Sequence, residues 1–260
     1  VFSMEVLNVC MNHVINDRVF SHHWRCSEQK ITHLAFADDL LLFSKGDSSS
    51  IFAVLDAVSM FSSISGLSPN PAKCTCYFGN IDIETKLAAL DYSGFIEGSL
   101  PVMYLGIPLV SRNLTVRDCQ PLITRICKRI SIWTSHFISQ AGRLQLINAI
   151  LFAIQGFWAG CIFLPNKVIK AVQGVFARYL WTSSLTSRGV YKVSWSDCCY
   201  PKDEGGIGIK NLSVWSTAAI LFQLWRIINK EDSIWIEWLY KFELKKKGFW
   251  TMRIPYKCSW

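Results

Sequence analysis

The chain has 260 residues, of which 51% are hydrophobic and 18% charged, so it can bury a sizeable core, and this composition argues against disorder. Its length suits one large or two small domains, and its formal net charge is +8. The ten cysteines form no Cys-x-x-Cys pair, so we expect free thiols and no structural zinc. His22, His23 and Cys26 could gather a metal ion, but no second ligand pair follows at a usable spacing.

Charge is distributed unevenly along the chain. Residues 1–109 hold six Lys or Arg and eleven Asp or Glu, whereas residues 110–200 hold eleven and two. Basic segments attract nucleic-acid phosphates because binding releases counterions. From charge alone, a nucleic-acid-binding surface and an ordinary solvated helical face are equally favoured for the middle of the chain.

The first part of the chain is predicted to mix helices and strands. The hairpin is the clearest signal, because two apolar runs meet at Asp38 and Asp39. The expected elements are a helix end over 1–15, a hairpin over 31–43, a helix over 51–65, and strands over 73–78 and 102–110.

The rest of the chain is predicted to be mostly helical, with composition changing near residue 110. The expected helices cover 115–138, 141–157, 165–181, 211–229 and 232–243. We therefore expect three segments, over residues 1–109, 110–200 and 201–260.

Residues 144–164 are apolar and long enough to cross a bilayer. Gln145, Asn148 and Gln155 would be costly in hydrocarbon, so a buried helix is favoured and no membrane partner is expected. A membrane-associated helical protein is the weaker alternative.

Asp38 and Asp39 place two carboxylates at a tight turn between apolar strands. Magnesium prefers oxygen ligands, and two-metal phosphoryl transfer uses carboxylates to hold cations about 4 Å apart. Aspartate is also a common turn residue, so the dipeptide by itself favours an ordinary turn.

Several motifs follow the hairpin along the chain, and together they favour a metal-binding hairpin over an ordinary turn. After Phe36-Ala37-Asp38-Asp39 they are Ser65-Gly-Leu-Ser-Pro-Asn-Pro-Ala-Lys73, Tyr104-Leu-Gly-Ile-Pro-Leu109, Arg129-Ile-Ser-Ile-Trp133, Ala141-Gly-Arg-Leu-Gln-Leu-Ile147 and Pro201-Lys-Asp-Glu-Gly-Gly-Ile-Gly-Ile209. The ordered set resembles the C-terminal palm and thumb of LINE-type (non-LTR) retrotransposon reverse transcriptases.

The resemblance implies an α+β fold, in which a partial reverse-transcriptase palm (antiparallel hairpin plus helices) precedes a mostly α-helical thumb-like region. For the intact enzyme it implies RNA-directed DNA polymerase activity by two-metal phosphoryl transfer, with Mg²⁺, or Mn²⁺ in its place. The implied partners are an RNA template, a DNA primer and dNTPs. The implied location is intracellular, in the nucleus or a cytoplasmic ribonucleoprotein.

The resemblance also assigns roles to particular residues. Asp38 and Asp39 would be the catalytic, metal-binding pair, while Phe36 and Lys73 would lie near the primer or nucleotide. The basic residues that would face the nucleic-acid backbone are Arg125, Lys128, Arg129 and Arg143. Structural interpretations remain open, since Lys73 could simply be solvated at a strand start and some basic residues could coat helices.

One catalytic group of the family has no counterpart in the sequence. Its third carboxylate comes from a strand well before the hairpin, and neither Glu5 nor Asp17 lies in that pattern. We therefore expect the isolated chain not to polymerise. A nucleic-acid-binding fragment without catalysis is the alternative from another class.

Overall fold

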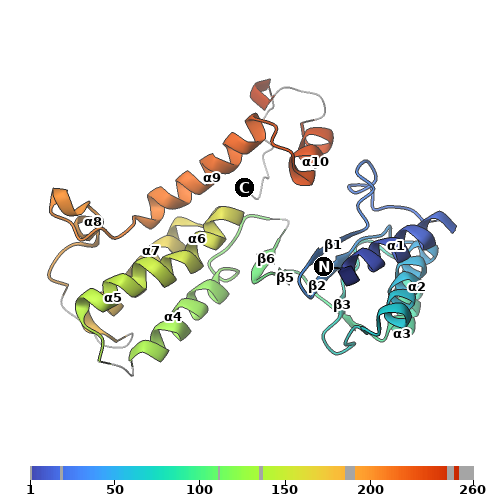
Figure 1. Ribbon diagram of the computed structural model, residues 1–260, viewed down its shortest axis with the longest axis horizontal. Helices are drawn as coiled ribbons and strands as arrows, with labels where there is room; N and C mark the ends of the chain where they lie inside the picture. Colours follow the sequence, from blue (N-terminus) through green and yellow to red (C-terminus); the bar gives the residue numbers. More distant parts are fainter. Residues whose placement is uncertain are drawn as a thin grey trace. The chain divides into compact units, whose positions relative to one another are not determined.

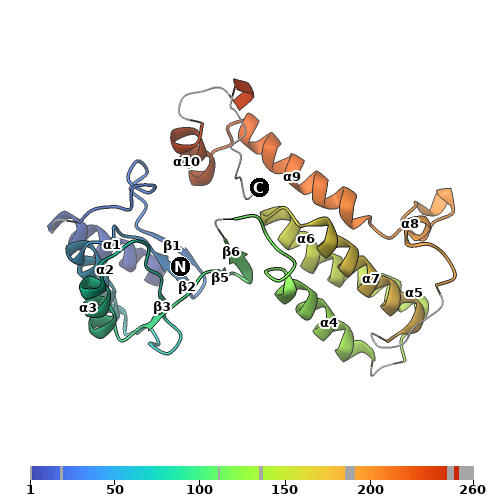
Figure 2. The same ribbon diagram turned by 180° about the vertical axis from the view of Figure 1, so that it is seen from behind.

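The computed structural model describes residues 2–17, 20–110, 112–134, 137–184, 191–244 and 249–251. The chain forms two compact units (Figures 1 and 2), one from the described residues within 2–105 and 232–251 and the other from those within 106–231. The described residues form helices and small two-stranded sheets, so the α+β class is confirmed. The three-segment division at residues 109 and 200 stays a prediction.

The first unit is built on two packed helices, α1 (Phe2–Asp17) and α2 (Ser48–Ser65). Their buried side chains recur at helical spacing and form one apolar core, made of Leu7, Cys10, Met11, Val14, Ala53, Val54, Ala57 and Phe61. Helix α2 begins three residues earlier than expected, because the Asp47 carboxylate caps it by accepting a hydrogen bond from Ser50 N. It ends at Ser65, as expected, and Gly66 is its C-cap.

The hairpin strands β1 (His33–Phe36) and β2 (Asp39–Leu42) pair antiparallel, as the sequence predicts. Strands β3 (Thr75–Cys76) and β4 (Ile96–Glu97) pair in parallel around helix α3 (Ile83–Ser93). Helix α3 and β4 were not expected from the sequence. The helix has a weak apolar pattern, since Ala89 is its one buried residue.

The predicted strand 102–110 is wrong as a single element. It divides into β5 (Val102–Tyr104) and β6 (Ile107–Leu109), because Leu105 and Gly106 both adopt positive φ, at 51° and 80°. A backbone in the left-handed region cannot continue an extended strand. The boundary between the two compact units falls at this point.

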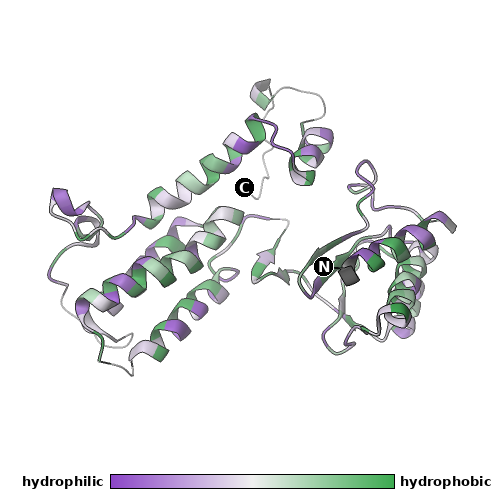
Figure 3. Ribbon diagram, viewed as in Figure 1, coloured by the Kyte–Doolittle hydropathy of each residue, from purple (hydrophilic) through white to green (hydrophobic). Residues whose placement is uncertain are grey.

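The second unit is a helical bundle around one core (Figure 3). Its helices are α4 (Gln120–Thr134), α5 (Gln140–Leu146), a π-helical turn (Ile147–Leu151), α6 (Phe152–Cys161), α7 (Asn166–Thr182), α8 (Trp195–Cys198), a 3₁₀ turn (Lys202–Glu204) and α9 (Leu212–Ile228). Figure 3 shows hydrophobic and hydrophilic residues sharing the length of α4 and α7, as expected for helices with one buried face.

The remaining helices belong to the first unit: α10 (Ile234–Phe242) and a 3₁₀ turn (Phe249–Thr251). The helix predicted over 115–138 starts later, at Gln120, and its last residues fall partly outside the described ranges. Among the described residues, helices 48–65 and 140–161 are apolar and long enough to span a membrane. Core helices of soluble proteins have the same length and composition, so these two helices are weak evidence for membrane insertion.

Candidate catalytic hairpin and nucleic-acid interface

The β1–β2 hairpin closes through the shortest common loop. Phe36 pairs with Asp39, which leaves Ala37 and Asp38 as the two turn residues. Ala37 adopts a φ of 52°, which is uncommon for a residue with a side chain and is a local source of strain. The turn holds Asp38 at the exposed tip, with Asp39 beginning β2 beside it.

Strand alternation separates the hairpin into two faces. Leu40 and Leu42 pack on the α1–α2 core, so their pairing partners Ala35 and His33 share that inward face. Phe36 and Asp39 lie opposite each other on the outward face, and Phe36 is 61% exposed. The hairpin therefore presents an aromatic ring and a carboxylate together on its outward face.

A phenol from a separate strand lies within electrostatic range of this carboxylate. The pKa of Tyr104, at the end of β5, is raised first by burial and then by the negative charge of Asp39. Like an ordinary tyrosine, it is protonated at neutral pH, and its hydroxyl can donate a hydrogen bond. Tyr104 lies within one of the sequence motifs, but residue spacing carries no sign that it comes near Asp39.

The carboxylate oxygens of the hairpin are ligands of the kind that Mg²⁺ prefers, but the hairpin provides only two acidic side chains. Among the residues that the structure describes, no group of three or more His, Cys, Asp or Glu side chains could hold a metal ion. This applies to His22, His23 and Cys26 as well as to Asp38 and Asp39. The pair can contribute two carboxylate ligands to a magnesium site, and among the described residues no third acidic side chain joins them in such a cluster.

Lys73 lies in a turn just before β3, away from the hairpin in sequence and exposed to solvent. The turn is shaped by Asn70, whose Oδ1 accepts a hydrogen bond from Ala72 N at 3.0 Å and whose carbonyl accepts one from Lys73 N at 2.9 Å. This geometry accounts for Asn70 structurally. The nucleotide role of Lys73 stays a prediction.

Helix α4 has a basic face opposite its buried face. Leu122, Ile126 and Ile130 are fully buried in the bundle core at intervals of four residues. The exposed cations are Arg125, Lys128 and Arg129, which recur at the three- and four-residue intervals that place side chains on one side of a helix. We call these three residues the α4 basic face.

The fourth predicted contact, Arg143, is in a different environment. It is half-buried, and its Nη1 donates a hydrogen bond to the Tyr179 carbonyl near the end of α7, at 3.2 Å. Its Nε is buried and has no partner among the described residues. Arg143 thus already neutralises a helix C-terminus, and its contact with nucleic acid stays a prediction.

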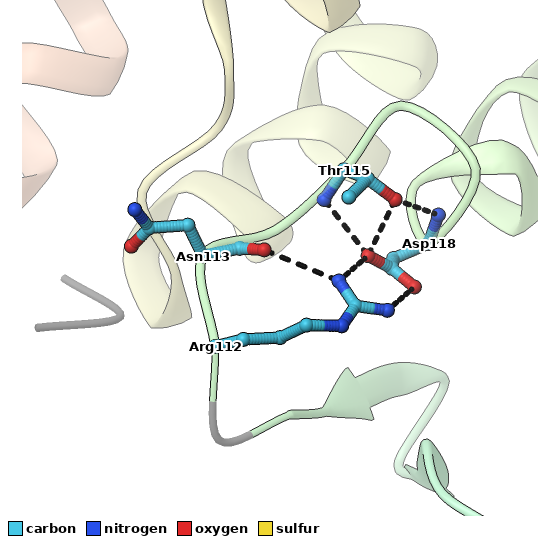
Figure 4. Close-up of polar contacts among 4 residues, drawn as sticks. All are labelled: Arg112, Asn113, Thr115 and Asp118. Atoms are coloured by element: carbon cyan, nitrogen blue, oxygen red, sulfur yellow. Dashed lines mark hydrogen bonds and ion pairs between the residues drawn. The ribbon is translucent and has the colours of Figure 1, made fainter. Parts of the chain in front are cut away.

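Sequence reasoning missed a polar cluster that fixes the start of α4 (Figure 4). The buried Asp118 carboxylate accepts hydrogen bonds from Arg112 Nη1 at 2.6 Å and Nη2 at 2.9 Å. It also accepts from Thr115 N at 2.8 Å and Thr115 Oγ1 at 2.7 Å. The Arg112 guanidinium, followed by Thr115, holds the pKa of Asp118 well below its ordinary value. A threonine followed three residues later by an acid is the signal that could have identified this cap.

The hairpin with its two aspartates lies in a segment that matches a known family. Residues 2–109 match the model of the family described as reverse transcriptase (RNA-dependent DNA polymerase). A reverse-transcriptase domain is therefore present in the first part of the chain, as the ordered motifs predicted.

A curated relative gives a weaker match. It is described as a "putative ribonuclease H protein" from Arabidopsis thaliana and is 27% identical over 129 residues. The aligned part covers 50% of this chain and 21% of the relative, so the chain matches about a fifth of that protein's length.

Proposed function

We propose that the chain is the C-terminal palm and thumb segment of a LINE-type retrotransposon reverse transcriptase, an RNA-directed DNA polymerase. The observation that carries the proposal is a two-residue turn exposing Asp38 beside Asp39, inside the segment that matches the reverse-transcriptase family. The partners are an RNA template, a DNA primer and dNTPs in the intact enzyme. Its expected location is intracellular, in the nucleus or a cytoplasmic ribonucleoprotein.

Asp38 and Asp39 would hold Mg²⁺, or Mn²⁺ in its place, when the rest of the site is supplied. The bound cations would stabilise the attacking and leaving oxygens of phosphoryl transfer. Phe36, on the same face as Asp39, offers an exposed ring for packing beneath a primer nucleotide. Tyr104 places a phenol within electrostatic range of Asp39, on the strand that follows in the family's order of motifs.

The α4 basic face would grip the backbone of the template–primer duplex. Its cations are exposed, and the helix beneath them is anchored by three fully buried isoleucine and leucine side chains. Because that surface needs no metal, a nucleic-acid-binding segment without catalysis is the second candidate. The apolar helix 140–161 supports the weaker membrane-associated alternative, and recovery of the chain in the soluble fraction without detergent would dispose of it.

Metal binding at the hairpin can be tested directly with Mn²⁺ by electron paramagnetic resonance. We expect the chain to bind Mn²⁺ weakly and to lose this binding in Asp38→Asn and Asp39→Asn. The matched control is Asp91→Asn, which removes an exposed carboxylate from α3 in the same compact unit. Equal Mn²⁺ binding by the parent and both hairpin variants would refute the assignment.

A primer-extension assay tests whether the chain is catalytic by itself. With Mg²⁺, dNTPs and an RNA template annealed to a DNA primer, we expect no extension above background, because two carboxylates leave the metal coordination incomplete. Extension that disappears in Asp38→Ala would overturn the proposal that the isolated segment is inactive, while supporting the catalytic role of the hairpin.

A further inference from the structure

A cluster of aromatic rings and one guanidinium joins the loop of residues 20–31 to helix α10 in the first unit. The guanidinium carbon of Arg25 lies 4.8 Å from the ring centroid of Trp24 and 6.0 Å from that of Trp238. The indole of Trp238 donates a hydrogen bond to the Arg25 carbonyl at 2.7 Å, and Phe242 stacks on Trp238 at 5.7 Å. We call Trp24, Arg25, Trp238 and Phe242 the Trp24 platform.

The backbone beneath the platform is held in place by several hydrogen bonds. Ser21 N donates to Ser50 Oγ of α2 at 2.8 Å, and Ser21 O accepts from Lys45 N at 3.1 Å. Within the loop, Cys26 N donates to His23 O at 2.7 Å and Ile31 N to Cys26 O at 3.0 Å. Trp24 is therefore carried by a loop whose backbone is held by hydrogen bonds at both ends.

Trp24 is 63% exposed even though it has a partner on one side. Its ring meets the edge of Phe242, at 6.3 Å between centroids and 69° between planes, and lies against the Arg25 guanidinium. A single exposed hydrophobic residue is unremarkable by itself. An exposed indole already oriented by a cation and a second ring differs, because a flat ligand can stack on it with little further loss of side-chain freedom.

Charged groups around the platform are balanced. Arg25 Nη2 lies 3.9 Å from Glu243, and Lys241 forms an ion pair of 2.6 Å with Glu237 on the same helix. A surface neutralised in this way attracts phosphate weakly. Ring stacking is the interaction that such a surface favours, and it accepts any nucleobase because every base has a π-face.

We propose that the Trp24 platform stacks an unpaired base of single-stranded nucleic acid. The proposal rests on the proposed function for the presence of nucleic acid, but it concerns a site that is separate from the hairpin and from the α4 basic face. Because the platform binds bases rather than phosphates, its contribution to affinity is nearly independent of salt, whereas that of the α4 basic face falls steeply with salt.

The test measures the affinity of the full chain for two fluorescent oligonucleotides by anisotropy. One is a short oligothymidylate, and the other is an abasic oligonucleotide of the same length and charge. We expect Trp24→Ala to weaken oligothymidylate binding by about 5- to 150-fold, the value of one base–aromatic stack, at every salt concentration. Binding of the abasic oligonucleotide should not change.

Matched variants separate stacking from folding. Trp24→Phe keeps an aromatic face and should restore most of the affinity, whereas Trp24→Leu keeps apolar bulk without a π-face and should not. Trp235→Ala removes another exposed indole, from α10 itself, and should leave binding unchanged. Circular dichroism checks the fold of each variant, and the Phe–Leu comparison decides the question if the alanine variant unfolds.

Three results would overturn the proposal: parental oligothymidylate affinity in Trp24→Leu, an equal loss for the abasic oligonucleotide, or the same loss in Trp235→Ala. Repeating the measurement in a background with Arg125, Lys128 and Arg129 changed to Gln separates the two proposals. If the Trp24 effect persists there, the platform stands whatever the α4 basic face contributes. If only the platform fails, the proposed function is untouched.

Discussion

Replacing the α4 basic face by glutamines is the most discriminating perturbation of the proposed nucleic-acid interface. Arg125→Gln, Lys128→Gln and Arg129→Gln remove three charges and retain hydrogen-bonding side chains with good helix propensity. All three positions are exposed, and the buried contacts of α4 come from its opposite face, at Leu122 and Ile126 among others. We therefore expect the triple variant to fold like the parent.

The size of the effect follows from counterion release. Each neutralised phosphate of a DNA duplex contributes a slope of about −0.9 to the plot of log affinity against log salt, so three contacts contribute about −2.7. When the salt concentration rises fourfold, from about 50 to about 200 mM, three such contacts by themselves lower the affinity by roughly 40-fold. The parent should therefore lose about 40-fold more affinity than the triple variant across this range, regardless of DNA sequence.

The assay is fluorescence anisotropy of a labelled DNA duplex titrated with each protein at several salt concentrations. The double variant Lys167→Gln/Lys170→Gln is the control, because it removes two exposed cations from α7 in the same unit. Its salt slope should equal that of the parent. An unchanged slope in the α4 variant, or an equal fall in the α7 variant, would refute the proposed role of α4.

The remaining predictions concern stability, each measured by urea denaturation. Gly106→Ala should lower the free energy of unfolding by about 1–2 kcal/mol, because a φ of 80° disfavours any residue with a Cβ; an unchanged midpoint would contradict this. Ser216→Ala should lower the free energy of unfolding by about 1–3 kcal/mol, because Gln155 Nε2 loses the buried Ser216 Oγ to which it donates a hydrogen bond at 3.0 Å. Adding Gln155→Leu should recover part of that loss, because it removes the amide left without an acceptor. A further loss of similar size would contradict this explanation. The pKa of Asp118 is depressed in the folded state, so its stabilising contribution is complete above its ordinary value of 3.8 and is lost as the pH falls below it. Asp118→Asn should consequently flatten the acid limb of the stability curve, and a parental acid limb in that variant would disprove the linkage.

Local sequence pattern by itself determined much of the secondary structure. The apolar runs on either side of Asp38 and Asp39 predicted the hairpin, and Gly66 marked the end of α2. The helical pattern of residues 115–138 predicted α4, although its first turn begins later, at Gln120. These features depend on neighbouring residues, whose side-chain periodicity is visible in the sequence.

Two errors show where local pattern is insufficient. The split of residues 102–110 into β5 and β6 follows from positive φ at Leu105 as well as Gly106, and a leucine gives no warning of that conformation. Helix α3 escaped prediction because it buries little apolar surface, and its caps, at Asp82 and Gly94, are its clearest markers.

Contacts between distant segments were decided by the tertiary structure alone. The approach of Tyr104 to Asp39, the bond from Arg143 to the Tyr179 carbonyl, and the bond from Trp238 to the Arg25 carbonyl each join residues far apart in the chain. Such pairings depend on how packed elements bring their side chains together. Sequence periodicity identifies the face that an element buries, but the residue it meets there is set by packing of the whole unit.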